Sequence, residues 1–110
     1  MAYKKMVPHV KAAWLTALRS GSYIQGRGFL REGDTFCCLG VLCDLGDKSA
    51  ESWAPDGFEA VFTFYEKSQY LPRCVRSAAR VSEVVSKRLA EMNDRGKDFD
   101  EIADWIEENL

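Results

Sequence analysis

The chain has 110 residues, enough to bury one modest core, so a single compact domain over residues 1–110 is expected. Its 46% hydrophobic and 29% charged residues are typical of a soluble globular protein, and no apolar run approaches the ~20 residues that span a bilayer. The net charge is only −2. No secretory signal pattern opens the sequence, so we expect a cytoplasmic protein with reduced cysteines and no membrane contact.

Charge is distributed unevenly along the chain. Residues 1–31 carry basic side chains and no acidic one, whereas residues 98–109 carry acidic side chains and no basic one. One interpretation is that the two ends pack together and neutralise each other. The other is that each charged segment forms a surface for a partner of opposite charge.

A helix followed by a hairpin is predicted in the first third of the chain. Residues 9–19 carry apolar side chains at helical spacing, and Gly21 follows the expected end of the helix. The turn around Gly33 lies between β-prone residues, which predicts a hairpin over residues 29–37.

The middle of the chain is predicted to hold a buried helix, a loop and a strand. Residues 38–45 are almost entirely apolar, so a short helix there should lie at the centre of the core. Gly40 costs this helix roughly 1 kcal/mol against alanine, which close packing against another element would justify. Residues 47–57 are expected to form a loop, and the aromatic alternation over residues 58–64 predicts a strand.

Three helices are predicted in the last third. A short one covers residues 73–79, and a longer one runs from its N-cap Ser82 to about Met92. Asp98 and Glu101 resemble a capping box for the last helix. The apolar stripe of that helix is Phe99, Ile102, Ala103 and Ile106.

These elements predict an α+β fold. Helices dominate, the sheet is small and antiparallel, and the short connection near residue 95 makes the last two helices an antiparallel hairpin. No internal repeat or linker divides the chain.

Four cysteines raise the question of a metal site. Cys37 and Cys38 are adjacent, Cys43 is five residues further on and Cys74 is distant, which is a poor match to the short paired spacings of zinc sites. We therefore expect Cys38 and Cys43 to act as small core hydrophobes, with no metal and no cofactor. Catalysis is not expected either, because no sequence signature places the one histidine, His9, beside a nucleophile.

The stretch "YIQGRGFLR" is the most distinctive candidate for ligand binding. Its glycines allow close backbone approach, its arginines offer planar forks for phosphate, and its tyrosine and glutamine suit a base or ribose. A nucleotide-like anion would use Tyr23, Gln25, Gly26, Arg27, Gly28 and Arg31. One short loop cannot enclose a ligand, so such a site would be completed at a subunit interface of a homo-oligomer. The alternative is a surface turn with solvated arginines.

Duplex nucleic acid is not an expected partner. The isoelectric point is about 5.4 and no recognition helix rich in Arg, Asn or Gln is evident. The acidic last helix instead offers a second candidate surface, at Asp104, Trp105 and Glu108, for a basic host protein.

Three stretches resemble a family of small proteins encoded by bacteriophages and prophages. They are "ALRSGSYIQGRGFLR", "FCCLGVLCDL" and "LAEMNDRGKDFDEIADWIEE", in the order of that family and over roughly half of the chain. The resemblance implies a phage origin and the host cell cytoplasm, and it carries over no catalytic residue. It suggests a non-enzymatic counter-defence protein: a sponge for a nucleotide-derived signalling molecule, or an inhibitor or adaptor of a host protein.

Overall fold

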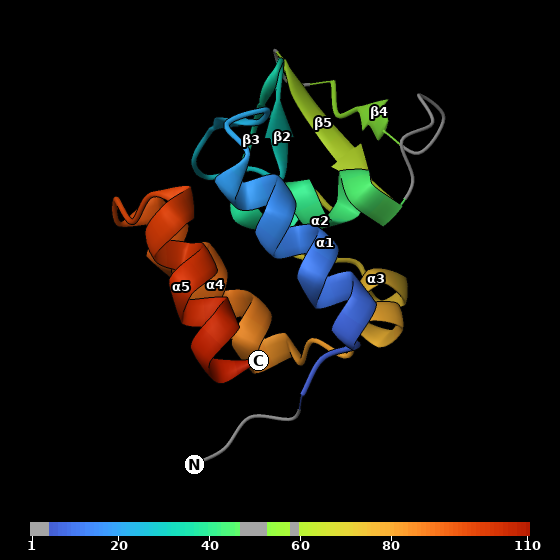
Figure 1. The fold of residues 1–110 in the computed structure, drawn as a ribbon. Coiled ribbons are helices and arrows are strands. Elements are labelled where there is room, and N and C mark those ends of the chain that lie inside the picture. Colours follow the sequence, from blue (N-terminus) through green and yellow to red (C-terminus); the bar gives the residue numbers. More distant parts are fainter. Residues whose placement is uncertain (1–4, 47–52, 58–59) are drawn as a thin grey trace.

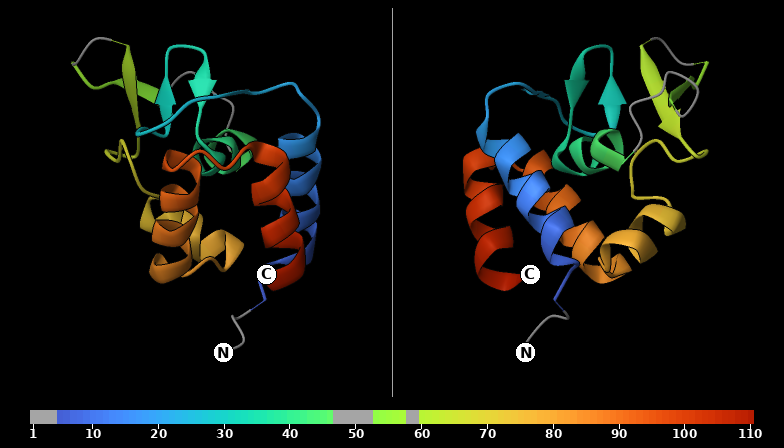
Figure 2. Two further views of the ribbon diagram at one scale, coloured as in Figure 1. Left: turned by 90° about the vertical axis from the view of Figure 1, so that its left-hand side faces the viewer. Right: turned by 45° about the vertical axis from the view of Figure 1, so that its right-hand side comes forward.

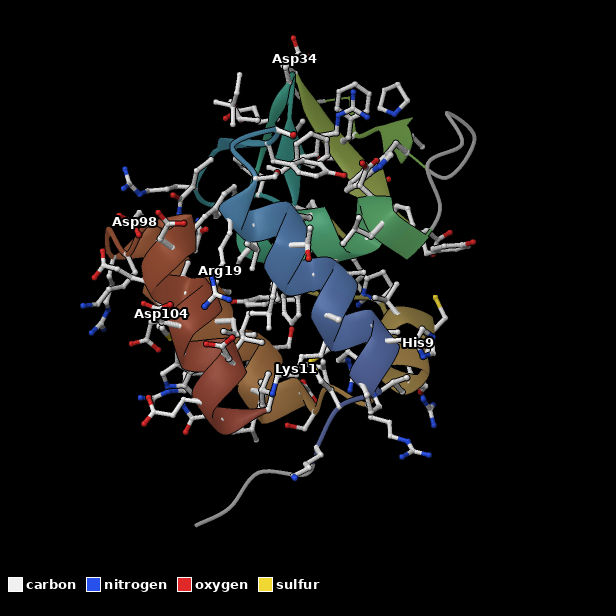
Figure 3. All side chains as sticks on the ribbon, in the orientation of Figure 1. His9, Lys11, Arg19, Asp34, Asp98 and Asp104 are labelled. Carbon is white, nitrogen blue, oxygen red and sulfur yellow. The ribbon has the colours of Figure 1, made fainter. Side chains whose placement is uncertain are left out.

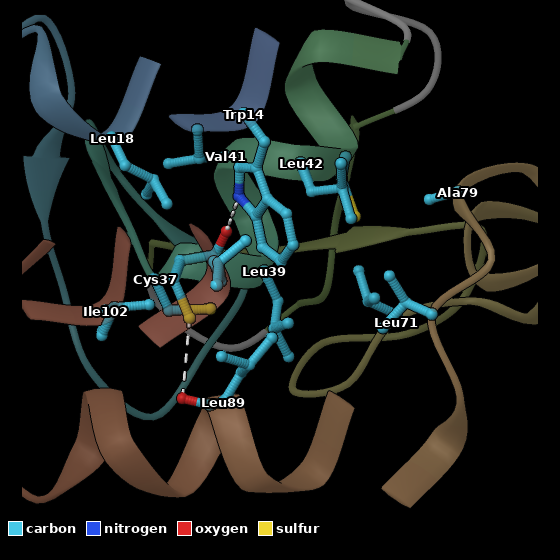
Figure 4. Close-up of a cluster of buried hydrophobic side chains, with 14 of the residues drawn as sticks. Trp14, Leu18, Cys37, Leu39, Val41, Leu42, Leu71, Ala79, Leu89 and Ile102 are labelled. Atoms are coloured by element: carbon cyan, nitrogen blue, oxygen red, sulfur yellow. Dashed lines mark hydrogen bonds between the residues drawn. The ribbon is translucent and has the colours of Figure 1, made fainter. Parts of the chain in front are cut away.

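Helix α2 (Cys38–Gly46) lies at the centre of the fold, between a small sheet and the other helices (Figure 1). The computed structural model describes residues 5–46, 53–57 and 60–110. Every residue of α2 from Cys38 to Cys43 is buried, as its apolar sequence predicts. Trp14 Nε1 donates to the Cys38 carbonyl at 2.9 Å, and Cys38 Sγ donates to the Leu89 carbonyl at 3.6 Å (Figure 4). The central helix is therefore bonded to helices on two sides.

Four further helices surround α2 in the described ranges. They are α1 (Pro8–Arg19), α3 (Arg73–Ala79), α4 (Glu83–Asp94) and α5 (Phe99–Asn109). The α+β class, the helix hairpin and all five helices are confirmed. No helix of the described part is long and apolar enough to cross a membrane.

The starts of the last two helices follow the predicted capping chemistry. Ser82 Oγ accepts from the Val85 amide at 3.1 Å. Asp98 and Glu101 form a reciprocal capping box, with bonds of 2.8 and 3.3 Å. Helices α4 and α5 then run antiparallel, side by side (Figure 2).

The sheet has five short strands in the order β1-β3-β2-β5-β4. They are β1 (Ile24–Gln25), β2 (Arg31–Glu32), β3 (Thr35–Phe36), β4 (Trp53–Pro55) and β5 (Val61–Phe64). The hairpin of β2 and β3 is confirmed, and the pairings β2–β5 and β4–β5 are also antiparallel. Strand β1 runs parallel to β3, which the sequence did not predict, so the sheet is mixed.

Two predictions in the middle of the chain need correction. Strand β4 forms within residues 47–57, which were expected to be a loop; residues 47–52 lie outside the described part. In β5 the buried residues are Val61 and Phe64, so strict alternation is wrong. Phe62 is only half-buried, and the guanidinium of Arg31 in β2 lies over its ring. Phe58 and Glu59, in the same predicted strand, lie outside the described residues.

Gly40 packs against backbone, as its place inside a buried helix suggested. A methyl group at Gly40 would run into the backbone carbonyl of Leu30. We expect Gly40→Ala to lower the free energy of unfolding by about 3 kcal/mol or more, because a backbone carbonyl moves only with its strand.

Gly46→Ala is the matched control at the end of the same helix. A Cβ there meets nothing within 4 Å, so this variant should be neutral or up to about 1 kcal/mol more stable. Urea denaturation of both variants measures the difference, and equal stabilities would contradict the close approach of α2 to Leu30.

Candidate functional site

The predicted ligand loop follows a fixed path between α1 and β2. The Gly26 amide donates to the Phe36 carbonyl at 2.8 Å, which continues the parallel pairing of β1 with β3. A Cβ at Gly26 would lie 2.5 Å from Thr35 Oγ1, so the close approach requires glycine. Gly28 has φ +86°, and its amide donates to Asp94 Oδ1 at 2.8 Å. The structure of the loop therefore explains why glycine occupies both positions.

Asn93 of α4 is the residue that holds this loop. Its carboxamide is fully buried, and Oδ1 accepts from Gln25 Nε2 at 3.0 Å and from the Cys38 amide at 3.2 Å. Its Nδ2 donates to the Gly26 carbonyl at 2.7 Å. Its backbone carbonyl accepts from Arg27 Nε at 3.2 Å. We call residues 25–28, Cys38 and Asn93 the Asn93 corner.

The corner joins the three stretches that carry the family resemblance. Gln25 to Arg27 belong to the first stretch, Cys38 to the second and Asn93 to the third. The sequence predicted that α4 ends at about Met92, so the role of Asn93 was missed. The signal was its spacing: it lies four residues after Leu89, in line with the buried face of the helix.

Tyr23 is also engaged within the protein. Its hydroxyl donates to Asp44 Oδ2 at 2.6 Å, and Trp53 Nε1 donates to Oδ1 of the same carboxylate at 3.2 Å. Its ring meets Phe36 edge to face, with centroids 5.2 Å apart. Burial raises the pKa of Tyr23 well above its ordinary value, and the hydrogen bond to Asp44 raises it further. The hydroxyl is thus a donor that fixes α2 against the loop.

Arg31 lies on the sheet, away from the partners of Arg27. Its guanidinium carbon is 4.3 Å from the ring centroid of Phe62, 5.3 Å from that of Phe36 and 5.7 Å from that of Trp53. Its Nε donates to the Gly33 carbonyl at 2.9 Å. Arg27 and Arg31 share no partner, so the structure does not arrange them as one phosphate clamp.

These contacts give most of the loop a structural role. Gln25 Nε2 also donates to the Lys97 carbonyl at 2.8 Å, so its donors face inward. Arg27 is the exception, since its side chain is exposed and only Nε is bonded to the protein within the described part. Ligand binding by the loop stays a prediction, with Arg27 as its available cation.

The cysteines divide as their sequence context suggests. Cys37, Cys38 and Cys43 are buried, which confirms Cys38 and Cys43 as core residues, while Cys74 is exposed. Burial raises the pKa of Cys37 to about 11 and that of Cys38 and Cys43 well above the ordinary value. These three therefore remain thiols at neutral pH.

The acidic last helix is partly neutralised by α1. Arg19 bridges Asp104 at 2.8 Å and Glu107 at 3.2 Å (Figure 3). Lys11 Nζ donates to the Glu107 carbonyl at 3.0 Å. This confirms the interpretation that the two charged ends pack together.

The other two candidate interface residues of that helix differ in exposure. Trp105 is half-buried, with the guanidinium carbon of Arg88 5.4 Å from its ring centroid. Glu108 is exposed and makes no ion pair with any described residue. Of the three, Asp104 is thus occupied by α1, and Glu108 is available.

Asn93→Asp should destabilise the protein most at neutral pH. The new carboxylate would face the Gly26 carbonyl without a donor, at a cost of about 3 kcal/mol. Burial raises the folded-state pKa of this carboxyl above its unfolded value of about 3.9. Below the unfolded pKa the protonated acid can donate as the amide does, so the deficit relative to wild type is small there. It grows as the pH rises through the folded-state pKa.

Asn109→Asp is the matched control for that change. Its Nδ2 donates to the Trp105 carbonyl near the end of α5, where it is half-buried. The cost should stay below about 1 kcal/mol. Urea denaturation over a pH series measures both variants, and equal deficits would refute the special role of Asn93.

Arg31→Met should lower the free energy of unfolding by about 1 kcal/mol. Methionine keeps apolar packing against the three rings but removes the cation–π attraction and the bond to Gly33. Lys87→Met, at an exposed position of α4 that forms an ion pair with Glu83, should change stability by less than half of that. Chemical denaturation separates the two; an unchanged Arg31→Met protein would mean that the stacked arginine contributes nothing.

Comparison with known proteins identifies the family. The family model of a domain of unknown function, DUF8296, matches residues 6–110, which include all the helices and strands described above. No curated protein and no solved structure matches the chain. The chain therefore belongs to the DUF8296 family.

Proposed function

We propose that this chain is a small, non-enzymatic phage-type protein that captures a nucleotide-derived signalling molecule in the host cytoplasm. The counter-defence role rests on the resemblance of the three stretches to phage and prophage proteins. The binding role rests on Arg27. Its guanidinium is the one cation of the predicted loop that is not stacked on rings.

The observation that carries the proposal is an exposed arginine on a rigid loop. The bond from Arg27 Nε to the Asn93 carbonyl directs the side chain, and its terminal amino groups have no acceptor among the described residues. The neighbouring backbone is already ordered by Asn93 and Asp94. A ligand would therefore bind without the entropy cost of ordering this loop.

One such corner covers only one side of a ligand. Pockets usually surround most of a bound small molecule, so a second copy of the chain would supply the opposite wall. A homo-oligomer is accordingly part of the proposal, and two Arg27 side chains would then face one anionic ligand.

A binding protein rather than an enzyme is supported by the chemistry of the nucleophiles. Three of the four cysteines are buried thiols with raised pKa. The thiolate is the reactive form of cysteine, so these three buried thiols are suited to packing in the core rather than to catalysis. Cys74 is exposed and lines the same groove as the one histidine of the sequence, His9, but no hydrogen bond joins these two side chains in the described part of the chain.

A second candidate is a protein inhibitor or adaptor that uses the outer face of α5. Asp100 and Glu108 are exposed there, and no described ion pair involves them. Arg19 bridges Asp104 and Glu107, which weakens the electrostatic attraction of this face to a basic partner. We therefore rank this function second.

Thermal denaturation with a panel of linear and cyclic nucleotides tests the proposed function. A ligand at 100 times its Kd should stabilise the wild-type protein by about 2.7 kcal/mol. Arg27→Ala removes a charge-assisted contact worth roughly 1.5–3 kcal/mol, so the ligand-induced shift should largely disappear. Lys87→Ala is the charge-matched control and should keep it.

Native mass spectrometry of the same complexes gives the stoichiometry. We expect one ligand for every two chains. Two results would contradict binding by the loop: an Arg27→Ala protein whose melting temperature nucleotides still raise as much as that of wild type, or a wild-type protein that no nucleotide stabilises. Either result would favour the second candidate function, at α5.

A further inference from the structure

An apolar groove lies on the side of the molecule away from the Asn93 corner. Its volume is about 430 Å³, within the size range of small-molecule sites. It is walled by α1, α2, α3 and the end of β5, and its floor is made of aliphatic side chains: Val10, Ala13, Leu42, Leu45, Val75 and Ala78. Helices α1 and α3 adjoin at this side in Figures 1 and 2. The groove therefore offers a hydrocarbon-lined space of useful size.

The polar groups of the groove come from three exposed residues. They are His9 of α1, Tyr65 at the end of β5 and Cys74 of α3 (His9 is labelled in Figure 3). None of them is an acid. The ligand would therefore find weak donors and acceptors among these three lining residues, none of which is a carboxylate.

Of the two helices beside the groove, α1 directs Lys11 and Arg19 to α5, so the basic charge near the groove comes from α3. Neither α1 nor α3 contains an acidic residue. On α3, Arg73 directly precedes Cys74, and Arg76 directly follows Val75; no described ion pair or side-chain hydrogen bond involves either arginine. Glu66, in the turn after Tyr65, is also exposed, so the basic side of the groove is the α3 side.

A tight hairpin turn forms the mouth of the groove. Phe64 and Lys67 exchange both backbone hydrogen bonds, at 2.8 and 3.1 Å. The two residues between them, Tyr65 and Glu66, have φ of 48° and 68°, as a two-residue hairpin turn requires. The turn places the Tyr65 ring edge to face against Phe64, which also lines the groove, and leaves it 57% exposed.

From this combination we infer that the groove binds an amphipathic anion, a single aliphatic chain that ends in a carboxylate or phosphate. The chain lies on the aliphatic floor. The head group lies beside α3, because the carboxyl end of α2 at Gly46 carries a partial negative charge that would repel it. This inference is independent of the proposed nucleotide site, which uses other residues.

Isothermal titration with straight-chain carboxylates tests the inference. Octanoate, nonanoate and decanoate should bind wild-type protein with an affinity that rises about fourfold per added methylene, the value for a buried chain. Decyltrimethylammonium, which has the same chain and a positive head, should bind at least tenfold more weakly than decanoate. Binding of both decyl compounds with equal affinity would overturn the anionic class.

Two variants on α1 locate the site. Ala13 lines the groove and is exposed, so Ala13→Trp should fill it and reduce decanoate affinity at least tenfold. Ala12 is also exposed on the same helix and does not line the groove, so Ala12→Trp should bind as wild type does. Equal affinities of the two variants would overturn the groove as the site.

Variants of α3 test where the head group binds. Arg73→Ala/Arg76→Ala should weaken decanoate about tenfold and leave the chain-length increment unchanged. Arg27→Ala, at the proposed nucleotide site, should leave decanoate affinity unchanged. The absence of any decanoate binding to wild-type protein, or an affinity that does not depend on chain length, would refute the inference without touching the nucleotide proposal.

Discussion

The buried carboxamide of Asn93 is the interaction on which the rest of the structure depends. Asn93 lies near the end of α4, and its carboxamide bonds to the loop after α1 and to the start of α2. A satisfied hydrogen bond adds only about 1 kcal/mol, whereas a buried group left without its partner costs about 1–3 kcal/mol. An apolar residue at position 93 would leave the Cys38 amide and the Gly26 carbonyl without partners. The main effect of Asn93 is therefore to make one path of the loop more stable than the alternatives, and its net contribution to the stability of the fold is smaller.

The second constraint acts through packing. Helix α2 approaches the sheet so closely that Gly40 touches the backbone of Leu30, while the Leu30 carbonyl accepts from the Cys37 amide at 3.2 Å. The hairpin is therefore fixed relative to α2 at one end by backbone contact. At the other end the aromatic side chains around Arg31, together with the Asp44 carboxylate, hold the sheet against the same helix.

Local chemistry made the helices predictable. Their apolar spacing, the Ser82 cap and the Asp98 capping box act within a few residues, so the sequence carried enough information. The hairpin turn at Gly33 was predictable for the same reason, because it too depends on a few neighbouring residues. The parallel pairing of β1 with β3 was missed, because two-residue strands have no pattern and their pairing depends on a loop fixed by a residue far along the chain.

The candidate site was predicted less well for a related reason. Tyr23, Gln25 and Arg31 look like ligand-binding groups in the sequence, but their partners lie tens of residues away, on α2, α4 and β5. Only tertiary packing decides whether such a side chain faces solvent or the protein. The same holds for the acidic helix, whose charge is partly met by Arg19 at the other end of the chain.

Native-state hydrogen exchange of the Cys38 amide tests the role of Asn93 most directly. This amide is buried and donates to Asn93 Oδ1, so it should exchange only through global unfolding. Its exchange free energy should equal the free energy of unfolding from urea denaturation. An exchange free energy several kcal/mol lower would show that the corner opens by itself, and would contradict the account of a loop held rigid by Asn93.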